Sequence, residues 1–172
     1  MDIVGSGDAV NLSSSTGTAP GLIAELSDNA IAQSGAGTGI LAQTSGTGLL
    51  DLTLASNTVA MGSSSQNAIT VVSGGDGGAG QVCMDSAGNS VTATGSGNGV
   101  AVQQLGTNSV FALDNLASPF DPAAVVSLLT TGNPLLSGVT GSSVPAVATL
   151  GGTNSGFTAT ASCVVPAPPV SD

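Results

Sequence analysis

The chain has 172 residues and a formal net charge of −10, because it carries ten carboxylates and no lysine, arginine or histidine. Nucleic acids and anionic lipid headgroups attract basic side chains, so we expect no nucleic-acid partner. No apolar stretch approaches the length of a membrane helix, so we expect no membrane insertion. Apolar residues make up 41% of the chain and aromatic residues only 2%, which predicts a folded domain with a narrow core of small side chains.

Residues 1–30 are predicted to form an N-terminal segment and a possible first coil of a repeat. Val10 and Leu12 alternate, and the steps from Leu12 to Leu22 to Ile31 span ten and nine residues. An exposed first coil would leave unpaired backbone groups at its edge. We therefore expect a cap or a partner at this end.

Residues 31–116 contain the repeat itself, in which an asparagine is followed by one variable residue and a β-branched aliphatic residue. The six asparagines are Asn29, Asn57, Asn67, Asn89, Asn98 and Asn108. Aliphatic residues recur mostly every nine or ten residues, at positions 31, 40, 49, 59, 69, 82, 91, 100 and 110. A short strand with apolar alternation explains this spacing, if it is followed by a turn of glycine or asparagine, which tolerate positive φ.

Taking these strands in threes predicts coils that start at residues 31, 59 and 91, with a period of 28 to 32 residues. In such a coil, asparagines at one recurrent bend can stack and form a hydrogen-bonded ladder. The pattern resembles the right-handed parallel β-helix repeat family of surface and secreted β-solenoids, over about Leu12 to Leu116. This resemblance implies an all-β parallel β-helix with about three strands per coil. A β-sandwich is the alternative.

A glycine-rich stretch, residues 74–80, interrupts the repeat and predicts a flexible loop at one coil corner. Its Asp76 stands between pairs of glycines, an arrangement similar to the calcium-binding glycine-rich nonapeptides. The motif occurs once, so we expect no cofactor here, with Ca²⁺ as the alternative.

Residues 117–165 are predicted to form a C-terminal cap region with a short helix and a return strand, followed by a Pro-rich tail at 166–172. The helix is expected over 121–130, with Asp121 as N-cap, Pro122 in the first turn and Gly132 just past the end. The return strand carries Cys163. A disulfide between Cys83 and Cys163 is expected, with two free thiols as the alternative. The bond would contribute about 4 kcal/mol on the chain-entropy estimate and indicate an oxidising compartment.

Catalysis is not expected. Lyases among β-helix proteins resemble one another in using a basic residue as the base, and this chain has none. The carboxylates of Asp28, Asp51, Asp76, Asp85 and Asp114 are scattered along the sequence, and we expect none of them to meet as a glycosidase pair.

The sequence therefore predicts a non-catalytic extracellular or cell-surface structural solenoid. Its expected partner is a further copy of itself, as in the subunits of a filament or sheath. One alternative is an adhesin or passenger module of a larger surface protein. Another is a cation-binding or ice-binding surface module, suggested by outward hydroxyls in the segment 92–94.

Overall fold

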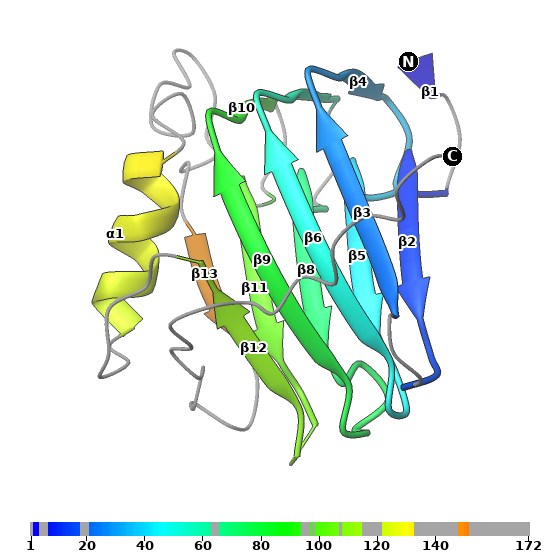
Figure 1. Ribbon diagram of the computed structural model, residues 1–172. Coiled ribbons are helices and arrows are strands. Elements are labelled where there is room, and N and C mark those ends of the chain that lie inside the picture. The colour runs from blue at the N-terminus through cyan, green and yellow to red at the C-terminus, as the bar shows by residue number, and fades with distance from the viewer. Residues whose placement is uncertain are drawn as a thin grey trace, which may run out of the picture.

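The computed structural model describes residues 2–3, 7–17, 21–62, 66–93, 97, 99–106, 108–114, 122–132 and 148–151. Parallel strands wind into a β-solenoid, and three strands make one coil (Figure 1). Three complete coils follow a first coil whose opening strand has two residues. The predicted fold class and the three strands per coil are confirmed.

Each coil contributes one strand to each of three sheets. Coil 1 contains β1 (Asp2–Ile3), β2 (Val10–Ser14) and β3 (Leu22–Ser27). Coil 2 contains β4 (Ala30–Gln33), β5 (Ile40–Thr44) and β6 (Leu49–Ala55). Coil 3 contains β7 (Thr58–Met61), β8 (Ile69–Ser73) and β9 (Gln81–Ala87). Coil 4 contains β10 (Ser90–Ala93), β11 (Val100–Gln104) and β12 (Val110–Leu113).

The strand register follows the sequence period. Sheet A has the order β1-β4-β7-β10, sheet B β13-β11-β8-β5-β2 and sheet C β12-β9-β6-β3. In sheet A, Ile31 lies beside Val59 and Val59 beside Val91. The predicted coil starts at 31, 59 and 91 are therefore confirmed.

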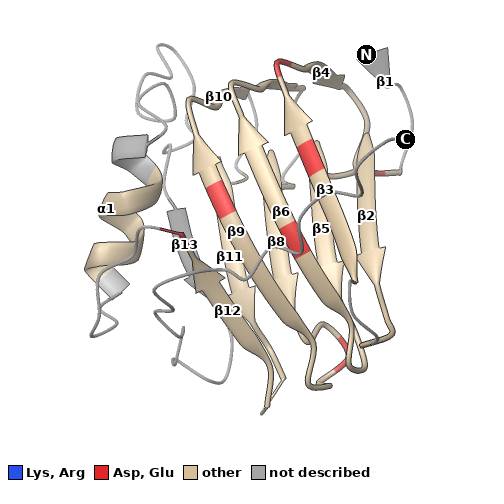
Figure 2. Cartoon of the chain, viewed as in Figure 1, with Lys and Arg blue, Asp and Glu red and all other residues tan. Residues whose placement is uncertain are grey.

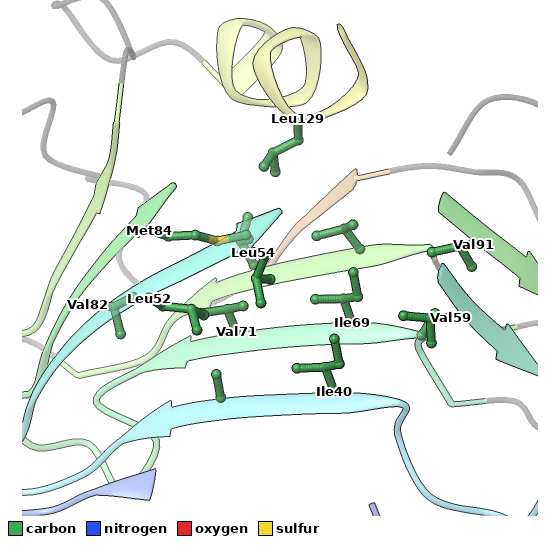
Figure 3. Close-up of a cluster of buried hydrophobic side chains, with 14 of the residues drawn as sticks. Ile40, Leu52, Leu54, Val59, Ile69, Val71, Val82, Met84, Val91 and Leu129 are labelled. Atoms are coloured by element: carbon green, nitrogen blue, oxygen red, sulfur yellow. The ribbon is translucent and has the colours of Figure 1, made fainter. Parts of the chain in front are cut away.

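The core is a column of aliphatic side chains between the three sheets (Figure 3). In β6, Leu50, Leu52 and Leu54 point inward and are almost completely buried. Alternation along a strand places every second side chain on the same face, so these leucines supply the sheet C part of the core layer of coil 2. Stacking these layers buries the column continuously.

Two aliphatic positions of the repeat point outward. In sheet C, Leu49 lies beside Gln81 and Gln81 beside Val110, and both aliphatic side chains are half-buried. The inward residue is the next one in each strand, Leu50 in β6 and Phe111 in β12. The repeat positions 49 and 110 are therefore the outward neighbours of the inward residues, because register, and not the Asn-x-aliphatic spacing, decides which face a side chain takes.

Sheet B departs from the expected one-sided burial. All five residues of β8 are buried, including Thr70 and Val72, whose side chains alternate with the inward Ile69 and Val71. A strand buried on both faces has a nearly continuous apolar sequence, which is what Ile-Thr-Val-Val provides.

Two corners require glycine because neighbouring coils approach closely. A Cβ atom on Gly37 would overlap the backbone of Gly7 in the coil below, and one on Gly106 would overlap the backbone of Gly78. The absence of a side chain lets the coils stack at the spacing of a β-sheet.

The corner between sheets C and A uses a left-handed residue in each coil. Asp28, Ser56 and Gly88 occupy equivalent positions with φ of 57°, 55° and 70°. Glycine adopts this conformation without strain, whereas a residue with a Cβ atom pays about 1 kcal/mol for it. Two of the three coils therefore carry backbone strain at this corner.

The helix α1 (Pro122–Gly132) covers the end of the solenoid formed by coil 4. Its Val125 and Leu129 are buried in the core cluster, and Leu129 points toward the column of aliphatic side chains (Figure 3). The predicted helix is confirmed, although Gly132 is its last residue. Beside it, β13 (Ala148–Gly151) pairs in parallel with β11. Asp121, the return strand with Cys163 and the tail 166–172 lie outside the described residues.

We predict that Ser56→Gly stabilises the protein and that Gly88→Ala destabilises it. Glycine at 56 removes the strain of a left-handed residue, although it also raises the entropy of the unfolded chain, so the net gain is about 0.5 kcal/mol. Alanine at 88 introduces the same strain and costs about 1 kcal/mol. Urea unfolding monitored by circular dichroism measures both changes. A loss of stability in Ser56→Gly would contradict the strained corner.

Candidate functional site

Three of the six asparagines form a ladder at the corner between sheets C and A. The backbone N–H and Nδ2 of Asn29 donate to Oδ1 of Asn57, at 3.1 and 3.0 Å. The same two groups of Asn57 donate to Oδ1 of Asn89, at 3.0 and 2.9 Å. Asn57 and Asn89 are fully buried. The amides also bond the strand ends, because Nδ2 of Asn57 donates to the Leu26 carbonyl at 2.7 Å.

The ladder has a direction. Each Oδ1 accepts from the coil that precedes it in the sequence, so within the described residues Asn29 presents its own Oδ1 toward the N-terminal end of the solenoid. Asn29 is exposed, in contrast to Asn57 and Asn89 in the following coils. A further coil stacked on the N-terminal end could therefore extend the ladder by donating to the Asn29 side chain.

The remaining asparagines do not join this ladder. Asn67 lies at a different corner, where its Nδ2 donates to Thr70 Oγ1 at 3.1 Å within the same coil. Asn108 is an exposed turn residue before β12. Asn98 lies outside the described residues. The Asn-x-aliphatic motif thus marks more than one kind of corner.

A second column of buried polar residues, which the sequence analysis did not predict, lies at the C-terminal ends of the strands of sheet B. It consists of the last residues of β2, β5, β8 and β11, namely Ser14, Thr44, Ser73 and Gln104. Thr44 Oγ1 accepts from the Gly74 N–H at 3.2 Å, which links coils 2 and 3. The signal that could have revealed the column is a small or amide polar residue at the same place in every coil.

The glycine-rich stretch 74–80 is a loop at a coil corner, as expected, and hydrogen bonds tie it to the neighbouring coil. Both carboxylate oxygens of Asp76 accept from the Gly46 N–H in the coil below, at 3.0 and 2.9 Å, and Oδ1 also accepts from the Gly78 N–H at 2.9 Å. Gly75 N–H donates to the Thr44 carbonyl at 2.8 Å. These backbone donors lower the pKa of Asp76. The carboxylate serves as an anchor between turns.

Asp8 has the same role in coil 1. Its Oδ1 accepts from the Thr38 N–H at 2.9 Å in the next coil, and its Oδ2 accepts from Asn11 Nδ2 at 3.0 Å. Among the described residues, no three His, Cys, Asp or Glu side chains form a group that could hold a metal ion. The geometry thus gives the alternative of bound Ca²⁺ no support.

Four carboxylates gather on the outer face of sheet C, which corrects the expectation that they are scattered. Figure 2 shows acidic positions on β3, β6 and β9, which correspond to Glu25, Asp51 and Asp85. Asp114 follows Leu113, whose register partner is Met84, so Asp114 lies beside Asp85. Strand register brings together residues that are about 30 positions apart in the sequence.

Asp51 is the least favourably placed carboxylate of this group. Its Oδ2 is buried and has no hydrogen-bond partner among the described residues. Burial raises its pKa, and the neighbouring charge of Asp114 raises it further. The residue lies between Ile23 and Cys83 in the register of sheet C.

Cys83 is half-buried on this same outer face. Cys163 lies outside the described residues, so the disulfide between the two cysteines stays a prediction. Thr92, at the start of the hydroxyl segment 92–94, is exposed on sheet A.

The two ends of the solenoid differ. At the N-terminal end, β2 and β3 are the outermost described strands of sheets B and C (Figure 1). Their inward side chains are only partly buried, whereas α1 covers the opposite end. In the described chain no helix is both long and apolar enough to cross a membrane.

Comparisons with known proteins add no relative to this description. No protein-family model matches the chain, and neither the curated proteins nor the solved structures gave a match. The β-solenoid architecture therefore stands on the strand pairing alone, and function has to be argued from the surfaces and ends just described.

We predict that Asn57→Ala lowers the free energy of unfolding by about 2 to 4 kcal/mol, because it removes the partner of two backbone groups, the Asn29 N–H and the Leu26 carbonyl, and breaks the amide ladder in its middle. Asn108→Ala is the matched control. It removes an exposed amide and should change stability by less than about 0.5 kcal/mol. Urea unfolding measures both variants. Similar losses in the two would contradict a specific role for the buried ladder.

We predict that Asp51→Asn raises stability at neutral pH. A carboxyl group whose pKa is raised by folding destabilises the folded state once it is ionised, so stability falls as the pH rises from the ordinary carboxyl range through the raised value. The variant should melt at a higher temperature than the parent above this window and at the same temperature below it. Melting curves across a pH series test this. A difference in melting temperature between variant and parent that is the same at every pH would contradict the role of ionisation.

Asp76→Asn should have the opposite pH dependence. The pKa of Asp76 is lowered by folding, so its contribution to stability is present above the ordinary carboxyl range and is lost as the pH falls through the lowered value. The variant should melt below the parent at neutral pH and approach it in acid. The same pH series serves as the measurement, and Asp85→Asn, at an exposed carboxylate, is the control.

Proposed function

We propose that this protein is a non-catalytic structural β-solenoid of the cell surface or extracellular space, and that it works by associating with copies of itself. The single observation that carries the proposal is the difference between the two ends. At one end α1 packs Val125 and Leu129 on the core, whereas at the other the inward side chains of the edge strands β2 and β3 are only partly buried. Strand edges of this kind pair with other strands unless they are blocked.

The chemistry of the chain supports a non-catalytic role. No lysine, histidine or arginine is present to act as a base or to hold an anionic substrate. Asp8 and Asp76 use their oxygens to bind backbone N–H groups. The carboxylates on sheet C lie on an outward strand face where Glu25 and Asp85 are exposed to solvent. Stabilisation of coils is the role that these contacts support.

An extracellular location is supported by the proposed bond between Cys83 and Cys163, because disulfides persist in oxidising compartments. Simple head-to-tail stacking into a filament requires two open ends, and α1 occupies one of them. A filament or sheath built from this subunit therefore needs a contact besides the N-terminal end, such as a lateral one between sheets.

The second candidate is an adhesin or passenger module of a larger surface protein. It is favoured by the same end, because Asn29 and the edges of β2 and β3 would also accept further coils of a longer chain. In that case the isolated chain has no need to bind a second copy.

Sedimentation velocity over a wide concentration range, combined with negative-stain electron microscopy, tests the proposal. We expect reversible oligomers whose population rises with concentration, since a cap at one end limits growth through the ends. A chain that remains monomeric at the highest concentration reached would remove self-association and leave the second candidate. The measurement is made with and without reductant to separate association through thiols.

A further inference from the structure

The partly covered apolar side chains at the N-terminal end continue the core. Leu22, Ala24 and Leu26 of β3 lie beside Leu50, Leu52 and Leu54 of β6 in register. The β6 leucines are almost completely buried, whereas the three β3 side chains are only partly covered. Leu12 on β2 is in the same position in sheet B. A further layer of inward apolar side chains would complete their burial.

We propose that this end is a symmetric interface at which two copies of the chain meet head to head, with β2 of each copy antiparallel to β3 of the other. The proposal rests on the proposed self-association and specifies its geometry. The end of a copy offers the edges of two sheets at a fixed angle, and the matching end of a second copy offers the same two edges at the same angle. A twofold axis makes every contact occur twice.

The strand lengths and directions favour this pairing. A twofold rotation about an axis perpendicular to the solenoid reverses the strand direction, so the meeting edges are antiparallel. An axis that passes through β1 and the corner between β2 and β3 places β2 against β3 of the second copy. These strands have five and six residues, whereas β1 has two. The two longest edges are thereby used together.

The charges of the edge strands also favour β2 against β3. The outward residues of β2 are Asn11 and Ser13, which are exposed and uncharged. Those of β3 are Ile23 and Glu25, also exposed. Pairing β3 with β3 of the second copy would bring two Glu25 carboxylates near each other, and like charges across a ladder destabilise it. Pairing β3 with β2 places each Glu25 near an amide or a hydroxyl group.

The same arrangement leaves one unfavourable contact, at the corners. The axis brings the corner of Asp28 in one copy to the corner of Asp8 in the other, and no basic side chain exists to neutralise them. This repulsion acts twice in the pair. Since ions screen exposed charges over about 10 Å at 0.1 M salt, the pair should form more readily as sodium chloride is added.

The test uses four exposed substitutions in the full chain, in two matched pairs. Asp28→Asn removes the corner repulsion, and asparagine tolerates the left-handed backbone at 28. Asp85→Asn makes the same change on an exposed residue of coil 3. Ser13→Glu adds a carboxylate to the outward face of β2, which pairs with the strand that carries Glu25 in the second copy, and Gln81→Glu adds one on an exposed residue of β9. Melting curves establish that each variant is folded.

Sedimentation velocity gives the dissociation constant of each variant. We expect Asp28→Asn to lower it and Ser13→Glu to raise it, each by roughly threefold to tenfold, since the altered contact occurs twice. The dissociation constants of the two controls should differ from that of the parent by less than about threefold, because these substitutions change only the net charge.

The outcomes separate the two proposals. Association that strengthens in Asp28→Asn and weakens in Ser13→Glu supports the head-to-head interface. Oligomers that respond to neither substitution more than to its control overturn this interface but leave self-association in place. Monomers in all five proteins overturn both. A species larger than a pair that Ser13→Glu leaves intact also overturns the interface as the main contact.

Discussion

The stacking of one coil on the next depends on pairing every backbone amide with a partner one turn away. Strands achieve this through the parallel ladders, whereas at the corners only some N–H groups reach a backbone carbonyl of the next coil and others bond to side chains. The side chains of Asn57 and Asn89 each supply an acceptor to the corner N–H of the preceding coil and a donor to the carbonyl near the end of the preceding strand of sheet C. Carboxylates at 8 and 76 supply acceptors at other corners. Coils that differ in length by up to four residues can therefore still stack in register.

This requirement also explains what an acidic chain does with its charge. A carboxylate that accepts from backbone N–H groups has its pKa lowered and stabilises the corner, as Asp76 does. A carboxylate on a strand face has no such donors. Asp51 faces the neighbouring charge of Asp114 with one oxygen buried, and its pKa is raised. The same residue type is stabilising at a corner and destabilising on a face, because only the corner offers unpaired N–H groups.

Much of the fold followed from the sequence because its period is local. The spacing of Asn29, Asn57 and Asn89 equals the length of a coil, so one motif indicated both the period and the ladder. The sequence did not distinguish these residues from Asn67 or Asn108, since corners of different geometry accept the same residue. In sheet C the repeat positions 49 and 110 face outward, because the choice between adjacent apolar residues depends on register. The carboxylates of β6, β9 and residue 114 meet only through pairing between coils, which no local pattern encodes.

The two ends of the solenoid differ in how their apolar side chains are covered. At coil 4, a helix needs no ladder partner, because its N–H groups bond within the helix, and α1 can cover apolar side chains without offering an edge. At coil 1, the edge strands have inward leucines that are only partly covered and an asparagine whose amide faces outward from the ladder. Strands can thus be added at the N-terminal end, whereas at the other end α1 packs on the core beside the edge strands β10, β12 and β13. A molecule of this kind favours closed, symmetric pairs over open chains, since two like ends satisfy each other and leave both helical ends outside.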